Sequence, residues 1–93
     1  MIELKGDRVQ VSGAMTIQSA AALMAEGESA VRGGASVIDL SRVDAADSSA
    51  LAVLFGWLRA ARGAERTLTI VQVPEGLRSL ADLYGVAELL PLA

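Results

Sequence analysis

The feature that most constrains this fold is the segment from Val37 to Leu54, in which a polar loop joins an apolar strand to an apolar helix. The first four residues, Val37 to Leu40, are almost continuously apolar, which is typical of a strand covered by other elements on at least one face. The polar loop over Ser41 to Asp47 follows directly. We therefore expect the rest of the chain to be organised around this strand, loop and helix.

The helix after the loop begins at the sequence Asp47-Ser48-Ser49. These residue types are favoured at a helix start, where a side-chain oxygen accepts a hydrogen bond from an unpaired backbone N–H group. The helix is expected to run from Ser48 or Ser49 to Arg62, with Ser48 as the better N-cap. A helix start also suits an anion or a polar side chain of a partner, so this sequence is the first candidate functional site.

The residues before this segment predict a hairpin and a helix. Ile2 to Lys5 and Arg8 to Ser12 each alternate apolar and polar residues around the turn signal Gly6-Asp7. Thr16 is a candidate N-cap for a helix that runs to about Val31. The apolar positions of that helix form one helical stripe of Ile17, Ala20, Ala21, Met24 and Val31.

The residues after this segment predict one more strand and one more helix. Thr67 to Val73 is rich in β-branched residues. A helix is expected over Glu75 to Tyr84, followed by one more turn over Val86 to Leu90. Its apolar stripe consists of Leu77, Leu80, Ala81 and Tyr84. The order ββαβαβα predicts an α/β fold with a partly parallel sheet and helices packed on it.

Composition excludes several classes of function. The 93 residues suit a single domain, 1–93, and a hydrophobic content of 53% argues against disorder. The net charge is −3 without a basic stripe, so we expect no nucleic-acid partner. The chain has no cysteine and no histidine, which removes thiol chemistry, the commonest general base and the commonest metal ligand. With neither a signal peptide nor an apolar run long enough to cross a bilayer, the chain is expected in the cytoplasm, without insertion into a membrane.

The helix after the loop carries two apolar faces. One face, which is the expected core stripe, consists of Leu51, Leu54, Phe55 and Leu58. The opposite face consists of Ser49, Val53, Gly56, Trp57 and Ala60. This second face has two interpretations. It is a docking face for another protein, with Trp57 as its anchor, or it packs on a neighbouring helix and completes the core.

The Asp47-Ser48-Ser49 sequence also has more than one interpretation. It caps the helix, or it is a partner contact in which Ser49 and Ser48 are candidate phosphorylation sites. A catalytic serine is disfavoured, because the chain has neither a histidine base nor a G-x-S-x-G elbow. A metal site built from Asp39, Asp44 and Asp47 is also disfavoured, since other ligands are lacking. We therefore expect no enzyme activity, no cofactor and no metal.

At these residues the sequence resembles the STAS domain family, which includes the bacterial anti-sigma-factor antagonists. The resemblance rests on a strand that ends in Asp39-Leu40-Ser41, followed by a loop and Asp47-Ser48-Ser49-Ala50-Leu51. It covers essentially the whole chain. It implies a mixed sheet with helices packed on one face, in the order given above.

Within that family the sequence is most similar to the small STAS subunit of Mla-type phospholipid ABC transporters. The segments that carry this similarity are Gly6-Asp7, Ser12-Gly13, Ile38 to Val43, Asp47-Ser48 with Leu51, Leu80-Ala81, Leu83 to Gly85 and Leu89 to Pro91. The C-terminal segments discriminate best, because the D-S-S sequence is common among STAS domains.

The resemblance gives the two hydroxyls different roles. In the Mla-type subunits a threonine at the position of Ser48 contacts the ATPase, whereas in the antagonists the phosphorylated serine is at the position of Ser49. One departure weakens the second role. The antagonists usually have glycine where this chain has Ala50, and alanine favours the helix by about 1 kcal/mol.

We therefore expect a non-enzymatic accessory subunit of a Mla-like system that transports phospholipid and maintains outer-membrane lipid asymmetry. It would bind the ATPase directly and the permease indirectly, so that it is cytoplasmic and peripheral to the inner membrane. The expected contact residues are Asp47, Ser48, Ser49, Val53, Trp57 and Ala60. The alternative is an anti-sigma-factor antagonist that is switched by phosphorylation and binds a serine kinase. Self-association through the Trp57 face stays open for the isolated chain.

Overall fold

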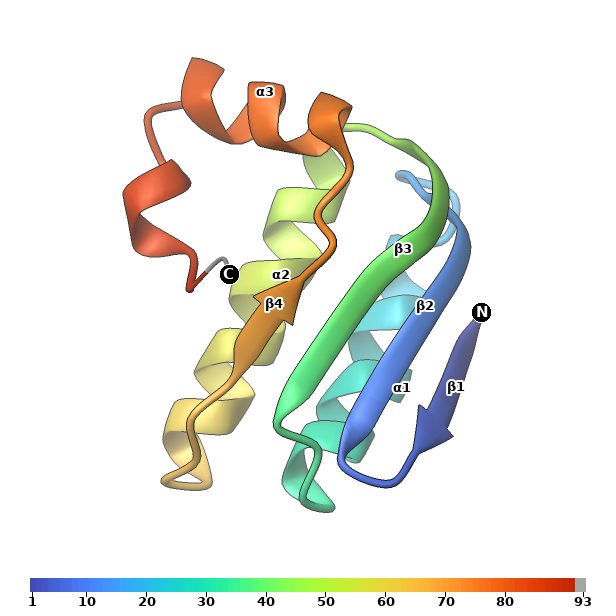
Figure 1. Cartoon of the computed structure of the whole chain (residues 1–93), viewed down its shortest axis with the longest axis vertical. Coiled ribbons are helices and arrows are strands. Elements are labelled where there is room, and N and C mark those ends of the chain that lie inside the picture. Colours follow the sequence, from blue (N-terminus) through green and yellow to red (C-terminus); the bar gives the residue numbers. More distant parts are fainter. Residues whose placement is uncertain (92–93) are drawn as a thin grey trace.

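The computed structural model describes residues 1–91, and within them the chain forms four strands, three α-helices and one short 3₁₀ helix (Figure 1). The strands are β1 (Ile2–Lys5), β2 (Arg8–Met15), β3 (Val37–Ala46) and β4 (Thr69–Val71). The helices are α1 (Ala20–Arg32), α2 (Ser48–Gly63), α3 (Glu75–Leu83) and the 3₁₀ helix η1 (Ala87–Leu89). The predicted order ββαβαβα is confirmed.

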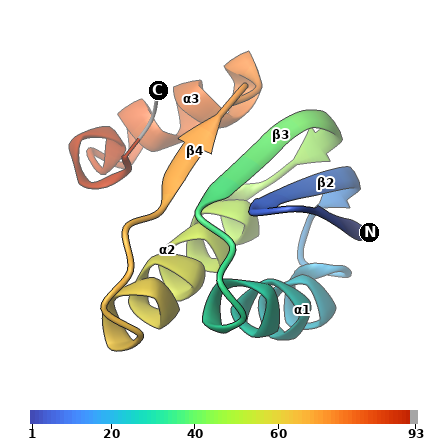
Figure 2. The same cartoon turned by 60° about the horizontal axis from the view of Figure 1, so that its bottom comes forward.

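The strands form one mixed sheet in the order β1-β2-β3-β4. β1 pairs antiparallel with β2, whereas β2 with β3 and β3 with β4 are parallel. The crossovers that join the parallel strands are α1 and α2, and Figure 2 shows both helices on the same face of the sheet. α3 lies across the end of the sheet at which β3 ends and α2 begins (Figure 1). The predicted mixed sheet with helices on one face is therefore confirmed.

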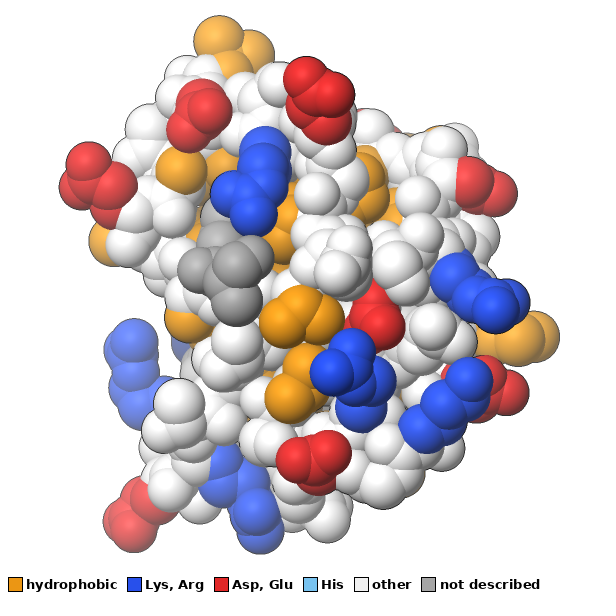
Figure 3. Space-filling view, in the orientation of Figure 1, with side chains coloured by type: hydrophobic (Ala, Val, Ile, Leu, Met, Phe, Trp, Pro, Cys, Tyr) orange, Lys and Arg blue, Asp and Glu red, His pale blue; other side chains and the backbone are white. Residues whose placement is uncertain are grey.

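The core lies between the sheet and the layer of α1 and α2. Strand side chains that point toward the helices are fully buried, and they include Val9, Val11, Ile38, Leu40 and Ile70. The other face of the sheet is turned toward the viewer in Figure 3, where Lys, Arg, Asp and Glu side chains lie beside hydrophobic ones. There the guanidinium of Arg8 donates to Asp39 at 3.1 Å, which gives the buried carboxylate of Asp39 a partner.

The two crossover helices pack closely because each has a glycine opposite a large side chain of the other. A side chain at Gly27 of α1 would overlap the indole ring of Trp57, and one at Gly56 of α2 would overlap the thioether of Met24. The indole N–H of Trp57 donates to the carbonyl of Leu23 at 3.1 Å, with the carbonyl of Met24 at 3.3 Å. The largest residue of the core is therefore both packed and hydrogen-bonded.

The prediction for the first helix was wrong in its start and in part of its stripe. α1 begins at Ala20, because Thr16 to Ser19 form a turn in which the Thr16 N–H donates to the Ser19 hydroxyl. Ile17 lies in this turn with 68% of its surface exposed, so it is not a core residue. The buried positions of α1 are Leu23, Gly27 and Val31, of which only Val31 was predicted.

Strand lengths also differ from the prediction. Residues 41–46 form the second half of β3 and not a loop, since they pair with β2 through two shifts of register. This half is largely exposed, which agrees with its polar sequence. β4 is shorter than predicted and covers only Thr69–Val71. Tyr84 follows α3 and is 56% exposed, so it does not belong to the buried stripe.

The contact between Gly27 and Trp57 gives a test of the helix packing. Glycine to alanine in a helix usually stabilises a protein by about 0.4–1 kcal/mol. Gly27→Ala is expected to do the opposite and to lower the free energy of unfolding by about 1–3 kcal/mol, because the added methyl group overlaps the indole ring. Chemical denaturation of the variant and the parent chain measures this difference.

The matched control is Gly76→Ala in α3, where an added methyl group meets no atom within 4 Å. It is expected to leave the free energy of unfolding unchanged or to raise it. Equal effects of the two substitutions would contradict the packing described for α1 and α2.

Candidate partner-binding site

The start of α2 is built around the carboxylate of Asp47. One carboxylate oxygen accepts from the Ser49 N–H at 2.8 Å, and the other accepts from the Ile17 N–H at 3.1 Å. The backbone N–H of Asp47 donates to the Met15 carbonyl at 3.2 Å. Asp47 is thus the N-cap of α2, and it also fixes the turn that follows β2 against the helix start.

Hydrogen bonding controls the charge of this carboxylate. Loss of solvent around Asp47 raises the pKa of its carboxyl group. Hydrogen bonds from the N–H groups of Ile17 and Ser49, together with the Ser49 hydroxyl, stabilise the charged form and lower the pKa by more. The net result is a pKa below the ordinary value of 3.8. The carboxylate therefore remains ionised at neutral pH, next to the positive end of the helix dipole.

The two serines differ in what they offer to a partner. Ser48 was predicted to be the better N-cap, and this is wrong because Asp47 has that position. Within residues 1–91, the Ser48 side chain makes no hydrogen bond and is exposed. Ser49 is half-buried, and its hydroxyl helps to lower the pKa of the Asp47 carboxyl group. Ser48 is therefore the hydroxyl that a partner can reach directly.

Two apolar side chains that the sequence did not single out for the site lie beside these serines. The backbone N–H of Ile17 donates to the Asp47 carboxylate, and 68% of the surface of Ile17 is exposed. Ala52 follows Ser48 by one helical turn and is also exposed. We call Ile17, Asp47, Ser48, Ser49 and Ala52 the α2-start surface. The signal that could have revealed Ile17 is that a large apolar residue occupies a turn sequence.

The predicted contact residues farther along α2 are not on the surface. Val53 and Trp57 are 1% and 0% exposed, and Ala60 is 9% exposed. They pack on α1, so the prediction that they form an exposed docking face is wrong and the alternative, that this face completes the core, describes the structure. The small residues Gly27 and Gly56 carry the corresponding signal in the sequence, because they allow the two helices to approach closely.

Of the three aspartates considered as metal ligands, Asp39 and Asp47 have separate partners, and Asp44 has none within residues 1–91. Asp39 accepts from Arg8 and from the Ser41 N–H, and Asp47 caps α2. Across residues 1–91 no group of acidic, histidine or cysteine side chains gathers in a way that could hold a metal ion. Nor does any helix in that part of the chain have the length and apolar character needed to cross a membrane.

Comparison with known proteins identifies the fold. The family model described as "Mlab, STAS domain" matches residues 2–91. Three solved structures are similar at TM-scores of 0.79, 0.76 and 0.68. They are an anti-sigma factor antagonist from Mycobacterium paratuberculosis, a candidate antagonist from Thermotoga maritima, and the phosphorylated form of the Bacillus cell fate determinant SpoIIAA.

The sequence identities to these structures determine whether the similarity shows more than a shared fold. They are 27%, 18% and 15% in the same order. The matches cover 99%, 99% and 100% of this chain and 81%, 83% and 89% of the other chains. At 18% and 15% the likeness shows the fold alone. Among curated proteins, none matches the chain.

The lowered pKa of Asp47 predicts a loss of stability in acid. A carboxylate whose pKa is lower in the folded than in the unfolded chain stabilises the fold above its unfolded value, near 3.8, and this contribution is lost as the pH falls through the folded pKa. Asp47→Asn removes the titrating group. Between pH 6 and pH 3, the free energy of unfolding is expected to fall less steeply in the variant than in the parent chain.

Denaturation at a series of pH values, followed by circular dichroism, measures both slopes. Asp44→Asn is the matched control, since Asp44 is exposed and makes no hydrogen bond or ion pair within residues 1–91. The control is expected to keep the parental slope. A parental slope in Asp47→Asn as well would contradict the described role of this carboxylate.

Proposed function

The chain belongs to the STAS domain family, and on that premise we propose that it is the accessory subunit of a Mla-type phospholipid ABC transporter. It binds the cytoplasmic ATPase through the α2-start surface and reaches the permease only through that ATPase. The support for the transporter assignment is the description of the matching family model, together with the Mla-like C-terminal sequence Leu83 to Gly85 and Leu89 to Pro91.

One observation carries the choice of surface. One oxygen of the Asp47 carboxylate accepts from the Ser49 N–H of α2 and the other from the Ile17 N–H, so both oxygens already have partners within the domain. Ser48 follows Asp47 directly and remains exposed, and the exposed Ala52 lies one helical turn after it. A hydroxyl on a helix start whose backbone is already held suits a stable contact, since little backbone entropy is lost when the partner binds.

The proposed mechanism is binding without chemistry. The ATPase passes through more than one conformation, and a subunit that binds one of them more tightly increases its population. The energy available for this shift is the difference between the two affinities. The chain itself contacts no lipid and takes no cofactor, and it stays at the cytoplasmic side of the inner membrane through its partner.

A second candidate function is that of an anti-sigma-factor antagonist, and one observation favours it. The structure from Mycobacterium paratuberculosis, which is an anti-sigma factor antagonist, shares 27% identity over 99% of this chain. In that case a serine kinase would phosphorylate Ser49. The half-buried Ser49 hydroxyl acts on the Asp47 carboxylate, so a phosphate there would meet a like charge and would disturb the helix cap. Because of this repulsion we place the second candidate below the first.

The test of the proposed function is the affinity for the purified ATPase of the Mla-type transporter from the same organism, measured by titration calorimetry. Ala52→Arg places a long charged side chain on the α2-start surface, one helical turn from Ser48, and is expected to weaken binding at least about tenfold. Ser48→Ala removes the exposed hydroxyl, and the loss of a hydrogen bond is expected to weaken binding about fivefold.

Ala25→Arg is the matched control, because Ala25 is exposed on α1 and lies in the groove beside β1. It is expected to bind the ATPase as the parent chain does. If the parent chain does not bind the ATPase but binds a serine kinase anti-sigma factor, the transporter assignment is wrong and the second candidate holds. If the ATPase binds all three variants equally, the chosen surface is wrong.

A further inference from the structure

The outer edge of β1 is free in the part of the chain that the structure describes. The opposite edge of the sheet is occupied, because the Ile70 N–H of β4 donates to the Pro91 carbonyl at 3.1 Å. β1 pairs only with β2 over residues 1–91. Figure 1 shows β1 at the margin of the sheet, away from the start of α3. A free edge presents unpaired backbone groups that can pair with another strand.

The hydrogen bonds to β2 determine which groups of β1 point outward. Met1 and Ser12 exchange both of their backbone hydrogen bonds, each at 2.8 Å. In an antiparallel pair such residues alternate with residues that do not bond across the pair. Because Ile2 pairs with Val11 and Leu4 with Val9, the backbone N–H and C=O groups of Ile2 and Leu4 point away from β2, toward the free edge.

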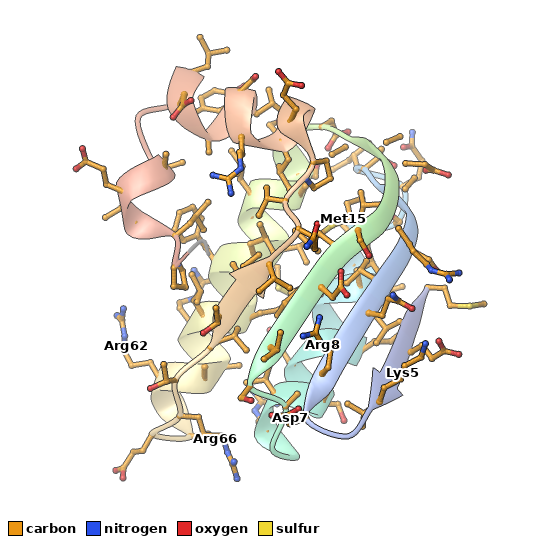
Figure 4. All side chains as sticks on the ribbon, viewed as in Figure 1. Lys5, Asp7, Arg8, Met15, Arg62 and Arg66 are labelled. Atoms are coloured by element: carbon orange, nitrogen blue, oxygen red, sulfur yellow. The ribbon has the colours of Figure 1, made fainter. Side chains whose placement is uncertain are left out.

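The side chains of β1 divide between the two faces of the sheet. Ile2 and Leu4 lie opposite the core residues Val11 and Val9, on the helix side, where they line a groove of about 500 Å³ with Ala25 and Ala30 of α1. Leu4 is nonetheless 56% exposed. Glu3 and Lys5 lie on the open face and form an ion pair at 3.3 Å. Figure 4 shows Lys5 on β1 near the end of the strand.

We propose that β1 pairs antiparallel with β1 of a second copy of this chain, so that the sheet continues across a two-fold axis at Leu4. The outward backbone groups of Leu4 bond to Leu4 of the second copy, because residues at the axis face each other directly. In this register Glu3 lies opposite Lys5 of the second copy, and Lys5 lies opposite its Glu3. The interface is therefore self-complementary in charge.

The neighbouring register is disfavoured by the same charges. With the axis at Glu3, Ile2 would lie opposite Leu4 of the second copy, which also satisfies the outward backbone groups. However, Glu3 would then face Glu3 of the second copy, and like charges directly opposite each other destabilise a strand pair. The sequence Glu3-Leu4-Lys5 thus selects a single register in which both ion pairs form and the exposed Leu4 side chains meet on the helix side.

β1 lacks two of the devices that protect a sheet edge, although its length of four residues limits how much pairing it can offer. Proline, a β-bulge or an inward-pointing charge would protect an edge, but Ile2 to Lys5 contain no proline and pair with β2 without a register shift. The strand is short, so we expect the dimer to be weak and to form at high protein concentration. The β1 edge is separate from the α2-start surface, and this inference does not depend on the proposed function.

Sedimentation equilibrium of the chain without an N-terminal tag, over a range of concentrations and at low salt, tests the proposal. The parent chain is expected to show a monomer–dimer equilibrium. Lys5→Glu places two acidic residues opposite each other in both halves of the interface and is expected to raise the dissociation constant at least about tenfold. Circular dichroism and thermal denaturation of the same samples confirm that the variant is folded.

The matched control exchanges the two charges in the double variant Glu3→Lys, Lys5→Glu. The exchanged residues again lie opposite their counter-charges, so dimerisation is expected to return to within about threefold of the parent. A parent chain that stays monomeric up to millimolar concentration would overturn the proposal. So would a dimer whose dissociation constant does not respond to Lys5→Glu, or one that the double exchange fails to restore.

Discussion

The reciprocal packing of α1 and α2 is the contact on which the rest of this structure depends. Each helix has a glycine where the other has a large side chain, so Trp57 occupies the space above Gly27 and Met24 the space above Gly56. A polar atom in the core is costly unless it has a partner, and the indole N–H meets the Leu23 carbonyl. The helix layer is therefore closed at its centre, and the sheet residues beneath it are fully buried.

This packing decides which part of α2 a partner can reach. Because the Trp57 side of the helix is used inside the domain, the proposed contact with a partner uses the helix start and its neighbours instead. Asp47 holds that start in place through hydrogen bonds to Ser49 and Ile17. These hydrogen bonds join the cap of α2 to the turn after β2, and the exposed Ser48 hydroxyl lies next to this junction.

The general plan of the fold follows from sequence patterns. The apolar strand from Val37, the Asp47-Ser48-Ser49 helix start and the order ββαβαβα are local signals, and the structure confirms the elements they predict. The first residue of α1 was not predictable in the same way, because a turn closed by Ser19 competes with a cap at Thr16. The second half of β3 was missed, since its residues are largely exposed and lack the apolar pattern of a buried strand.

The candidate site was less predictable than the fold. Helical periodicity shows that α2 has two apolar faces, but it does not show whether the second face meets another helix or another protein. Only the position of Gly27 opposite Trp57 decides this, and that is a relation between residues far apart in the sequence. The choice between Asp47 and Ser48 as the cap also depends on tertiary structure, because Asp47 is fixed by the Ile17 N–H of a distant turn.

In the proposed complex a partner covers the start of α2 while the Trp57 side stays inside the domain. Hydrogen–deuterium exchange of the chain, alone and in complex with the Mla-type ATPase, distinguishes these two parts of the helix. We expect added protection over residues 16–18 and 47–52. We expect no change at Trp57, which is fully buried in the free chain. Added protection confined to residues 53–60, with none at the helix start, would contradict this proposal.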